Sequence, residues 1–412
     1  MPQVESRSGK PVIRSYGRWL VLAGVWLIYF SFGVTIASMA PLLAPISAEL
    51  GIGNSTMGAI LGAWPLTYIV AAIPCGILLD RFGERRMLFA ATLVMAASGL
   101  ARSLADTPLE LLLAVGLFGA GGPMISVGAP KLIAGLFEGR DRGTAMGLYV
   151  TGPYLGGVVA LALTNSVVLP LADNDWRNVM LIYAGLVALS GVVWLVLSAP
   201  GIAPAPSAGP GGGKKFNFSA FSEILALPEV RIILLMSIGI FFINHAMNNW
   251  LPEILRSRDF TPVSAGYWAA LSAAVGIAGA IIVPRLATPD RRLAVMATLF
   301  LCALLASLLL RSNLVPLLVT GLILQGIARG GMMTVAILIL METPNVPKER
   351  LGLAGGLFFT TAEVGGVLGP VTFGILSDLG DGFALPLGSI TLVCLVLCVL
   401  LWLLRRIHAS CL

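Results

Sequence analysis

One arginine lies inside an otherwise apolar or small-residue stretch of this sequence. Arg329 is part of "GLILQGIARGGMM", and no second charge occurs between Val315 and Leu340. A guanidinium stays protonated at ordinary pH, so it needs a carboxylate, water or an anionic ligand as a partner. Two interpretations follow. Arg329 binds a carboxylate or other oxyanion of a substrate, or it pairs permanently with Glu363 in "FFTTAEVGG".

A second cluster of polar residues lies in the stretch "FFINHAMNNW", residues 241–250. Its polar members are Asn244, His245, Asn248 and Asn249. Spacings of three and four residues predict that they share one face of a helix. Polar groups in the middle of an apolar stretch are costly in lipid and usually face a water-filled cavity or one another. We therefore expect Asn244 and Asn248 to bind substrate, whereas His245 either contacts the ligand or is a satisfied packing residue.

The wall of a water-filled cavity around these polar residues would need further side chains. Aromatic residues on other apolar stretches are candidates, and the alternative for each is packing between helices or at an interface. They are Trp64, Tyr68, Tyr149, Tyr154, Tyr267 and Trp268. Glu363 has a second predicted role as a proton carrier, because a protonated Glu363 would release Arg329 and couple proton movement to anion movement.

The composition indicates what positions these residues. The 412-residue chain is 57% hydrophobic and only 11% charged, whereas soluble domains carry roughly 25% charged residues. Apolar stretches long enough to cross a bilayer, which takes about 20 helical residues, recur twelve times. The predicted spans are 19–42, 56–79, 87–105, 108–136, 144–171, 177–199, 231–255, 262–284, 293–310, 314–341, 351–376 and 384–404. The fold class is therefore an all-α polytopic membrane protein, and no cleavable signal peptide is expected.

The distribution of Lys and Arg predicts the orientation in the membrane. With the N-terminus in the cytoplasm, five of the 26 Lys and Arg residues fall outside, Arg329 lies in the membrane, and the remaining 20 fall inside. The outer five are Arg102, Arg177, Arg256, Arg258 and Arg311. This asymmetry predicts an inner-membrane protein with both termini in the cytoplasm. The net charge of +6 is thus a topology signal, and no nucleic-acid partner is expected.

The chain divides into two halves that repeat each other. "PGIAPAPSAGPGGGKK", from residue 200, is too rich in proline and glycine for a helix. The predicted domains are a tail (1–18), a six-helix bundle (19–199), a linker with a short amphipathic helix (200–230), a second six-helix bundle (231–404) and a tail (405–412). "GLYVTGPYLGG" and "GLFFTTAEVGG" align at an offset of 209 residues. Such a repeat implies pseudo-symmetric bundles around a central pathway.

A loop with regularly placed glycines and charged residues lies between the second and third spans, in "GILLDRFGERR". The residues of the pattern are Gly76, Asp80, Arg81, Gly83, Arg85 and Arg86. They resemble the loop motif of the major facilitator superfamily, and the layout of twelve spans in two halves extends the resemblance over the chain. The resemblance implies a conformational latch, in which Asp80 meets a helix N-terminus or an arginine of the other bundle in the outward-open state. The arginines could instead be only positive-inside anchors.

Two further segments resemble different transport groups. "GPYLGG", with Gly152, Pro153, Gly156 and Gly157, is similar to the fifth-span motif of proton-coupled drug exporters. Its alternative role is a helix bend with close contact between bundles. "GAPKLIAGLFEGRDRGTAMGLY", residues 128–149, resembles uptake carriers of small anions such as cyanate, nitrate or oxalate and formate. The repeat places Ala120 opposite Arg329, so the arginine is not part of the shared scaffold.

These observations predict a secondary active transporter that moves a small, anionic organic or inorganic solute by alternating access, with proton coupling as an option. The first alternative is a proton-driven exporter of drugs or other amphipathic compounds. A second is a non-transporting receptor or assembly partner on the same fold. No enzyme activity, cofactor or metal is expected, because the sequence shows no P-loop and no nucleophile or metal-ligand pattern. The expected partners are a small-molecule substrate, protons and the lipid bilayer, and the expected state is a monomer.

Overall fold

The computed structural model describes residues 15–199, 218–343, 346–347, 350–380 and 382–410, most of which are helical and none of which lies in a strand. Residues 200–217 of the predicted linker, and the ends of both predicted tails, lie outside the described residues. The first half contains α1 (Ser15–Ala37), η1 (Ala40–Leu42), α2 (Leu43–Leu50), α3 (Asn54–Phe82), α4 (Glu84–Ser103), α5 (Pro108–Leu136), α6 (Gly139–Leu163), η2 (Thr164–Val168), α7 (Leu169–Leu171) and α8 (Trp176–Leu197). The second contains α9 (Phe218–Ala226), α10 (Pro228–Arg256), α11 (Pro262–Leu286), α12 (Arg292–Leu309), α13 (Val315–Met341), α14 (Leu351–Leu379) and α15 (Ala384–Ser410).

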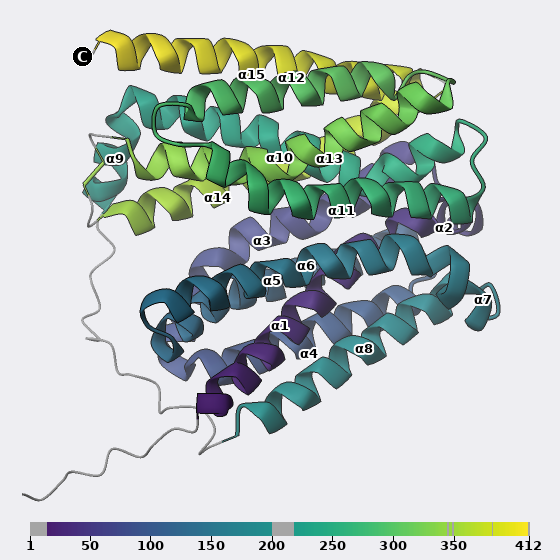
Figure 1. Cartoon of the computed structure of the whole chain (residues 1–412). Coiled ribbons are helices and arrows are strands. Elements are labelled where there is room, and N and C mark those ends of the chain that lie inside the picture. The colour runs from purple at the N-terminus through teal and green to yellow at the C-terminus, as the bar shows by residue number, and fades with distance from the viewer. Residues whose placement is uncertain (1–14, 200–217, 344–345, 348–349, 381, 411–412) are drawn as a thin grey trace, which may run out of the picture.

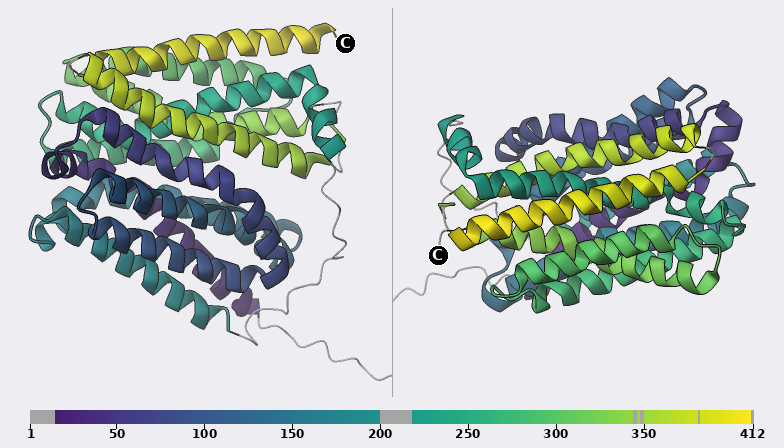
Figure 2. Two further views of the ribbon diagram at one scale, coloured as in Figure 1. Left: turned by 180° about the vertical axis from the view of Figure 1, so that it is seen from behind. Right: turned by 90° about the horizontal axis from the view of Figure 1, so that it is seen from above.

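Twelve long helices correspond to the twelve predicted spans, which confirms the all-α membrane fold. Eleven of them, in the described residues, are long and apolar enough to cross a membrane. The twelfth, α4, carries Arg85, Arg86 and Arg102 within its 20 residues. Figures 1 and 2 show α1 to α8 gathered in one half and α10 to α15 in the other.

The internal repeat reappears as two matched helix crossings. An added Cβ at Gly156 of α6 would lie 2.1 Å from the carbonyl oxygen of Phe30 in α1. At Gly365 of α14, 209 residues later, it would lie 1.9 Å from the carbonyl oxygen of Ile238 in α10. Glycine is required at both positions because the backbones touch there. The sequence repeat is therefore a repeat of helix packing.

The two halves meet closely at one end of the molecule. This end, where α3 and α11 begin and α14 ends, is called the far end below; the opposite end, where α8 ends and α10 begins, is called the linker end. At the far end, a Cβ on Gly58 of α3 would lie 2.5 Å from the carbonyl oxygen of Pro370. On Gly374 of α14 it would lie 2.1 Å from that of Asn54, and on Gly266 of α11 it would lie 2.5 Å from that of Leu161. The α3–α14 and α6–α11 contacts thus close the far end.

The ion pairs at the linker end, among the described residues, each join two residues of the same half. In the first half Arg18 pairs with Asp141 at 2.6 Å, and Lys131 pairs with Asp80 at 2.9 Å and with Glu84 at 3.2 Å. The pairs of the second half are Arg292 with Glu342 and Arg350 with Glu223. These ion pairs of the described residues therefore stabilise each half by itself.

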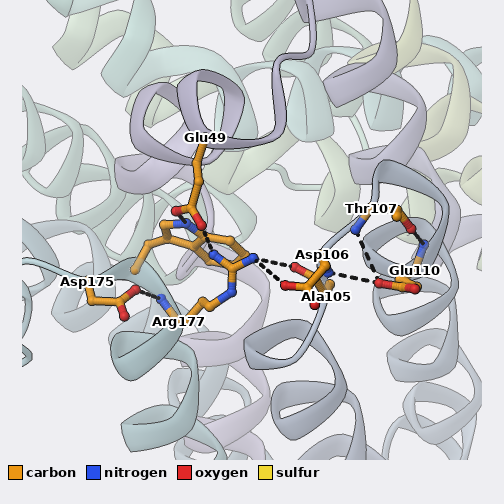
Figure 3. A network of polar contacts seen from close by, with 8 residues as sticks. Glu49, Ala105, Asp106, Thr107, Glu110, Asp175 and Arg177 are labelled. Atoms are coloured by element: carbon orange, nitrogen blue, oxygen red, sulfur yellow. Dashed lines mark hydrogen bonds and ion pairs between the residues drawn. The ribbon is translucent and has the colours of Figure 1, made fainter.

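A charged network ties the loops of the first half together at the far end (Figure 3). Arg177, at the start of α8, pairs with Glu49 of α2 and, at 3.0 Å, with Asp106 before α5. A capping box of Thr107 and Glu110 begins α5, and the Glu110 carboxylate also accepts from the amide of Asp106 at 2.8 Å. These contacts make the far end of the first half a connected unit.

Candidate functional site

A cavity of about 230 Å³ lies between the two halves, near the middle of the long helices. Ligand pockets usually measure roughly 300–1,000 Å³, so this cavity suits a small molecule. Its first-half wall consists of Tyr29, Gly33, Ile36, Ala37, Trp64, Val150, Pro153, Tyr154, Gly157 and Leu161. Its second-half wall consists of Phe241, Asn244, His245, Asn248, Ala273, Arg329 and Met333. The polar side chains are therefore concentrated on α10 and α13.

Arg329 has a neutral partner. Its Nη2 donates a hydrogen bond of 2.7 Å to Oδ1 of Asn248, and no carboxylate of the described residues forms an ion pair with it. Glu363, the predicted structural partner, is not bonded to Arg329 in this conformation. A guanidinium has five N–H donors, so donors remain for a ligand. Asn248 holds the side chain in place without neutralising its charge.

Glu363 lies behind the cavity wall and faces His245 instead. Its Oε2 lies 3.7 Å from Nε2 of His245 and has no hydrogen-bond partner among the described residues. Gly366 leaves room for this pair, because a Cβ there would lie 2.5 Å from the same carboxylate oxygen. The His245 ring is stacked between Trp64 of α3, at 5.2 Å, and Phe241, at 5.6 Å, measured between ring centroids. His245 thus separates Glu363 from the cavity and contacts the opposite half.

The other residues predicted on α10 divide between the cavity and the core. Asn244 lines the cavity, and its buried Oδ1 has no hydrogen-bond partner in the described structure. Asn249 does not share that face, contrary to the expectation. It is buried, and its amide donates to the carbonyl oxygen of His245 at 2.8 Å. A residue five positions after Asn244 is rotated well away from it on a helix of 3.6 residues per turn, which explains the error.

The predicted aromatic residues also separate into two groups. Trp64 and Tyr154 line the cavity, whereas Tyr149 stacks on Tyr29 at 4.5 Å behind it. The hydroxyl of Tyr68 bonds to that of Ser126 at 2.7 Å. Tyr267 is half exposed on the outer surface and Trp268 packs against the core, so neither lines this cavity. The remaining lining residues were not predicted: they are Tyr29, Gly33, Ile36, Ala37, Val150, Leu161, Phe241, Ala273 and Met333.

The loop motif lies at the linker end and contacts its own half. Asp80 accepts from Lys131 of α5, and Arg85 donates to Oγ of Ser198 at 3.0 Å. Gly83 has a φ of +78° at the junction of α3 and α4, a conformation that favours glycine. The expected contact of Asp80 with the other half concerns a conformation closed at this end, and it stays a prediction.

The glycine–proline segment of α6 packs within the first half, not between the halves as one interpretation expected. Gly152 and Gly156 lie against the backbone of α1, and Pro153 against Gly33. Helix α6 continues through Pro153 to Leu163. Regular α-helix geometry is interrupted later, in the π-helical segment η2. Gly157 and Pro153 reach the cavity wall, so the segment supports the site by close packing.

Comparison with known proteins agrees with this architecture. The sequence model described as Major Facilitator Superfamily matches residues 25–314 and 289–410. The chain belongs to this superfamily. Its relatives are membrane transporters, so the chain is a transporter and not an enzyme.

Named relatives cover most of the chain at low identity. A probable galactarate/D-glucarate transporter of Escherichia coli is 22% identical over 89% of this chain and 88% of its own length. The 3-(3-hydroxy-phenyl)propionate transporter of the same organism is 25% identical over 89% of both chains. A solved bacterial homologue of the human lysosomal transporter Spinster superimposes with a TM-score of 0.80 at 16% identity, covering 97% of this chain and 98% of that one. The last likeness shows the shared fold.

Proposed function

We propose that this protein is a secondary active transporter of a small organic anion, and that Arg329 binds the anion's carboxylate. The observation that carries the proposal is the pairing of Arg329 with neutral Asn248 in a cavity between the halves. A partly buried cation without a counter-ion is costly, and a bound carboxylate would supply the missing charge through two parallel hydrogen bonds. Relatives named as carriers of galactarate and of an aryl propionate support an organic anion.

Alternating access follows from the packing of the halves. Glycine-mediated contacts close the far end, while ion pairs at the linker end stay within each half. If the linker end faces the cytoplasm, as the distribution of Lys and Arg predicts, this conformation is inward-open. Transport then requires the linker end to close and the far end to open around the cavity.

Proton coupling is proposed for Glu363, acting next to His245. The carboxylate is buried, lies behind the cavity wall and touches an imidazole that lines the cavity. A proton taken up by Glu363 would therefore be exchanged with the cavity by way of His245. Such buried carboxyl groups in membrane helices are proton sites in many transporters. Direct release of Arg329 by Glu363 is not needed, because the two are not bonded.

The test is counterflow in proteoliposomes with a panel of small carboxylates. The wild-type chain should exchange at least one of them saturably, and Arg329→Gln should abolish exchange while leaving thermal unfolding unchanged. Arg329→Lys keeps the charge but not the planar fork, so it should retain only weak exchange. Arg405→Gln, at an exposed arginine near the end of α15, is the control. Export of amphipathic cations with no carboxylate exchange would overturn the proposal in favour of drug export.

The coupling role is tested separately. Glu363→Gln should keep counterflow, which needs no net proton movement, and should lose accumulation driven by a proton gradient. Accumulation at the wild-type level in Glu363→Gln would remove Glu363 from the coupling step without affecting the assignment of Arg329.

A further inference from the structure

The two walls of the cavity differ in chemistry. The second-half wall supplies Arg329, His245 and the amides of Asn244 and Asn248. The first-half wall contains no charged side chain and no amide; its polar atoms are the phenol groups of Tyr29 and Tyr154 and the indole N–H of Trp64. A ligand that contacts both walls is therefore expected to place its charge against the second half and an uncharged body against the first.

The charge of the cavity limits the ligand to one carboxylate. Among the described residues of the lining, Arg329 is the one permanently charged side chain. A charge on His245 would already be matched by Glu363, 3.7 Å away. The second carboxylate of a dicarboxylate would have no cation to pair with, and an unpaired buried carboxylate is strongly unfavourable. The lining thus selects against aldaric acids such as galactarate.

The apolar wall also selects against polyhydroxylated monocarboxylates. Each hydroxyl of a sugar acid needs a hydrogen-bond partner when it leaves water. The wall opposite Arg329 offers mainly carbon: Ile36, Val150 and Leu161, with the rings of Trp64 and Tyr154. Phe241 adds a third ring on the second-half side. Flat apolar groups pack favourably on such rings in stacked or edge-to-face geometry.

We propose that the substrate is an aryl monocarboxylate, with its carboxylate on Arg329 and its ring against the parts of Trp64, Tyr154 and Phe241 that line the cavity beside His245. This inference rests on the proposed function and narrows its substrate class. The cavity volume of about 230 Å³ favours a single ring.

The experiment compares three probes on the full chain in proteoliposomes: 3-phenylpropionate, gluconate and galactarate. Each is tested for counterflow, and in detergent for the shift of the thermal unfolding midpoint that a bound ligand produces. We expect 3-phenylpropionate to exchange with at least tenfold higher apparent affinity than the two sugar acids. Equal or better exchange of gluconate or galactarate overturns the aryl assignment and leaves the proposed function intact. Exchange of none of the three overturns both.

Variants of the ring site give a second measurement. Phe241→Leu keeps apolar volume but removes a ring, and should weaken 3-phenylpropionate at least fivefold. Trp64→Phe keeps a ring and should have a smaller effect than Trp64→Ala. Tyr267→Leu removes a ring from the outer surface, where Tyr267 is 50% exposed, and should change nothing. An unchanged affinity in both Phe241→Leu and Trp64→Ala would place the substrate ring elsewhere and overturn the inference.

Discussion

Asp378 on the last turn of α14 caps the first turn of α3, in the opposite half of the molecule. Its carboxylate accepts hydrogen bonds from the amide and hydroxyl of Ser55, at 2.7 and 2.6 Å, and from the amide of Asn54, at 3.1 Å. The side chain of Asn54 also donates to Ser377 at 2.7 Å. A carboxylate at a helix N-terminus gains from the helix dipole and from the free amides. These bonds join the halves at the far end.

Removing the charge of Asp378 should weaken closure of the far end. Asp378→Asn keeps the size but loses the charge-assisted bonds, at a cost of about 1 kcal/mol, which shifts the conformational equilibrium by about fivefold. The measurement is the distance distribution between spin labels at Leu171 and Leu385, exposed residues of the two halves, in a cysteine-free background. We expect a larger population of long distances than in the parent chain.

Asp106→Asn provides the matched control at the same end. Asp106 pairs with Arg177 within the first half, so its loss should leave the distance distribution unchanged. If Asp378→Asn and Asp106→Asn give the same distribution, the bonds of Asp378 contribute nothing to closure.

Asp80 occupies the corresponding place at the linker end. It lies in the last turn of α3, which runs antiparallel to α14, as Asp378 lies in the last turn of α14. When the linker end closes, Asp80 should leave Lys131 and cap the start of α14 near Leu351. Asp80→Asn is therefore expected to favour the present conformation, and to slow exchange severalfold without weakening ligand binding.

Glu84→Gln separates this role from a simple ion-pair effect. Glu84 contacts the same Lys131 at 3.2 Å but begins α4. The Glu84→Gln variant should therefore exchange substrate at a rate near that of the wild type. An Asp80→Asn chain that exchanges at the wild-type rate would leave the loop arginines as topology signals alone.

The apolar stretches made the helices predictable, and the repeat made the two halves predictable. The predicted span 108–136 coincides with α5, because a capping box and a proline mark its start. The arginine and the amides of the candidate site were recognisable, because polar groups inside membrane-spanning stretches are rare. The hydrogen-bond partner of each polar residue could not be predicted: Arg329 donates to Asn248 and does not contact Glu363.

Some lining residues and long-range contacts could not be predicted from the sequence, for physical reasons. Tyr29 lies in α1, which is apolar on nearly every side, so no periodicity marks the face that lines the cavity. Phe241 is three and four residues before Asn244 and His245, so helical spacing from these polar residues was the signal that could have found it. The bonds between Asp378 and Ser55 join residues 323 positions apart, and no local pattern announces such a contact. Lys131, at the end of an apolar span, gave no sign of its pairing with Asp80.

Exposed glycines at the linker end should become an interface when that end closes. Gly147 continues, at helical spacing, the face of α6 whose residues Val150 and Tyr154 line the cavity. Gly356 is its counterpart in α14, and an added Cβ at either position meets nothing within 4 Å. Gly147→Trp or Gly356→Trp should therefore preserve folding and ligand binding but reduce counterflow at least tenfold, because the indole obstructs closure.

Gly185→Trp tests whether tryptophan itself is harmful. Gly185 on α8 is equally open but lies on neither α6 nor α14. It should leave counterflow unchanged. Counterflow at the wild-type rate in Gly147→Trp and Gly356→Trp would show that these faces stay apart throughout the cycle.

Asn248 should decide whether Arg329 is available to a substrate. Asn248→Asp would place a carboxylate 2.7 Å from the guanidinium, where the amide oxygen now lies, and this internal anion would compete with the ligand. We expect thermal stability to be equal or higher and anion binding to be lost. Asn248→Ala removes only the positioning bond, worth about 1.5–3 kcal/mol for a charged group, so binding should weaken by roughly 10- to 100-fold. Binding of carboxylates by Asn248→Asp at wild-type affinity would exclude Arg329 as the anion site. A greater loss of carboxylate binding in Asn248→Asp than in Asn248→Ala is expected, because the guanidinium would already be neutralised by the new aspartate.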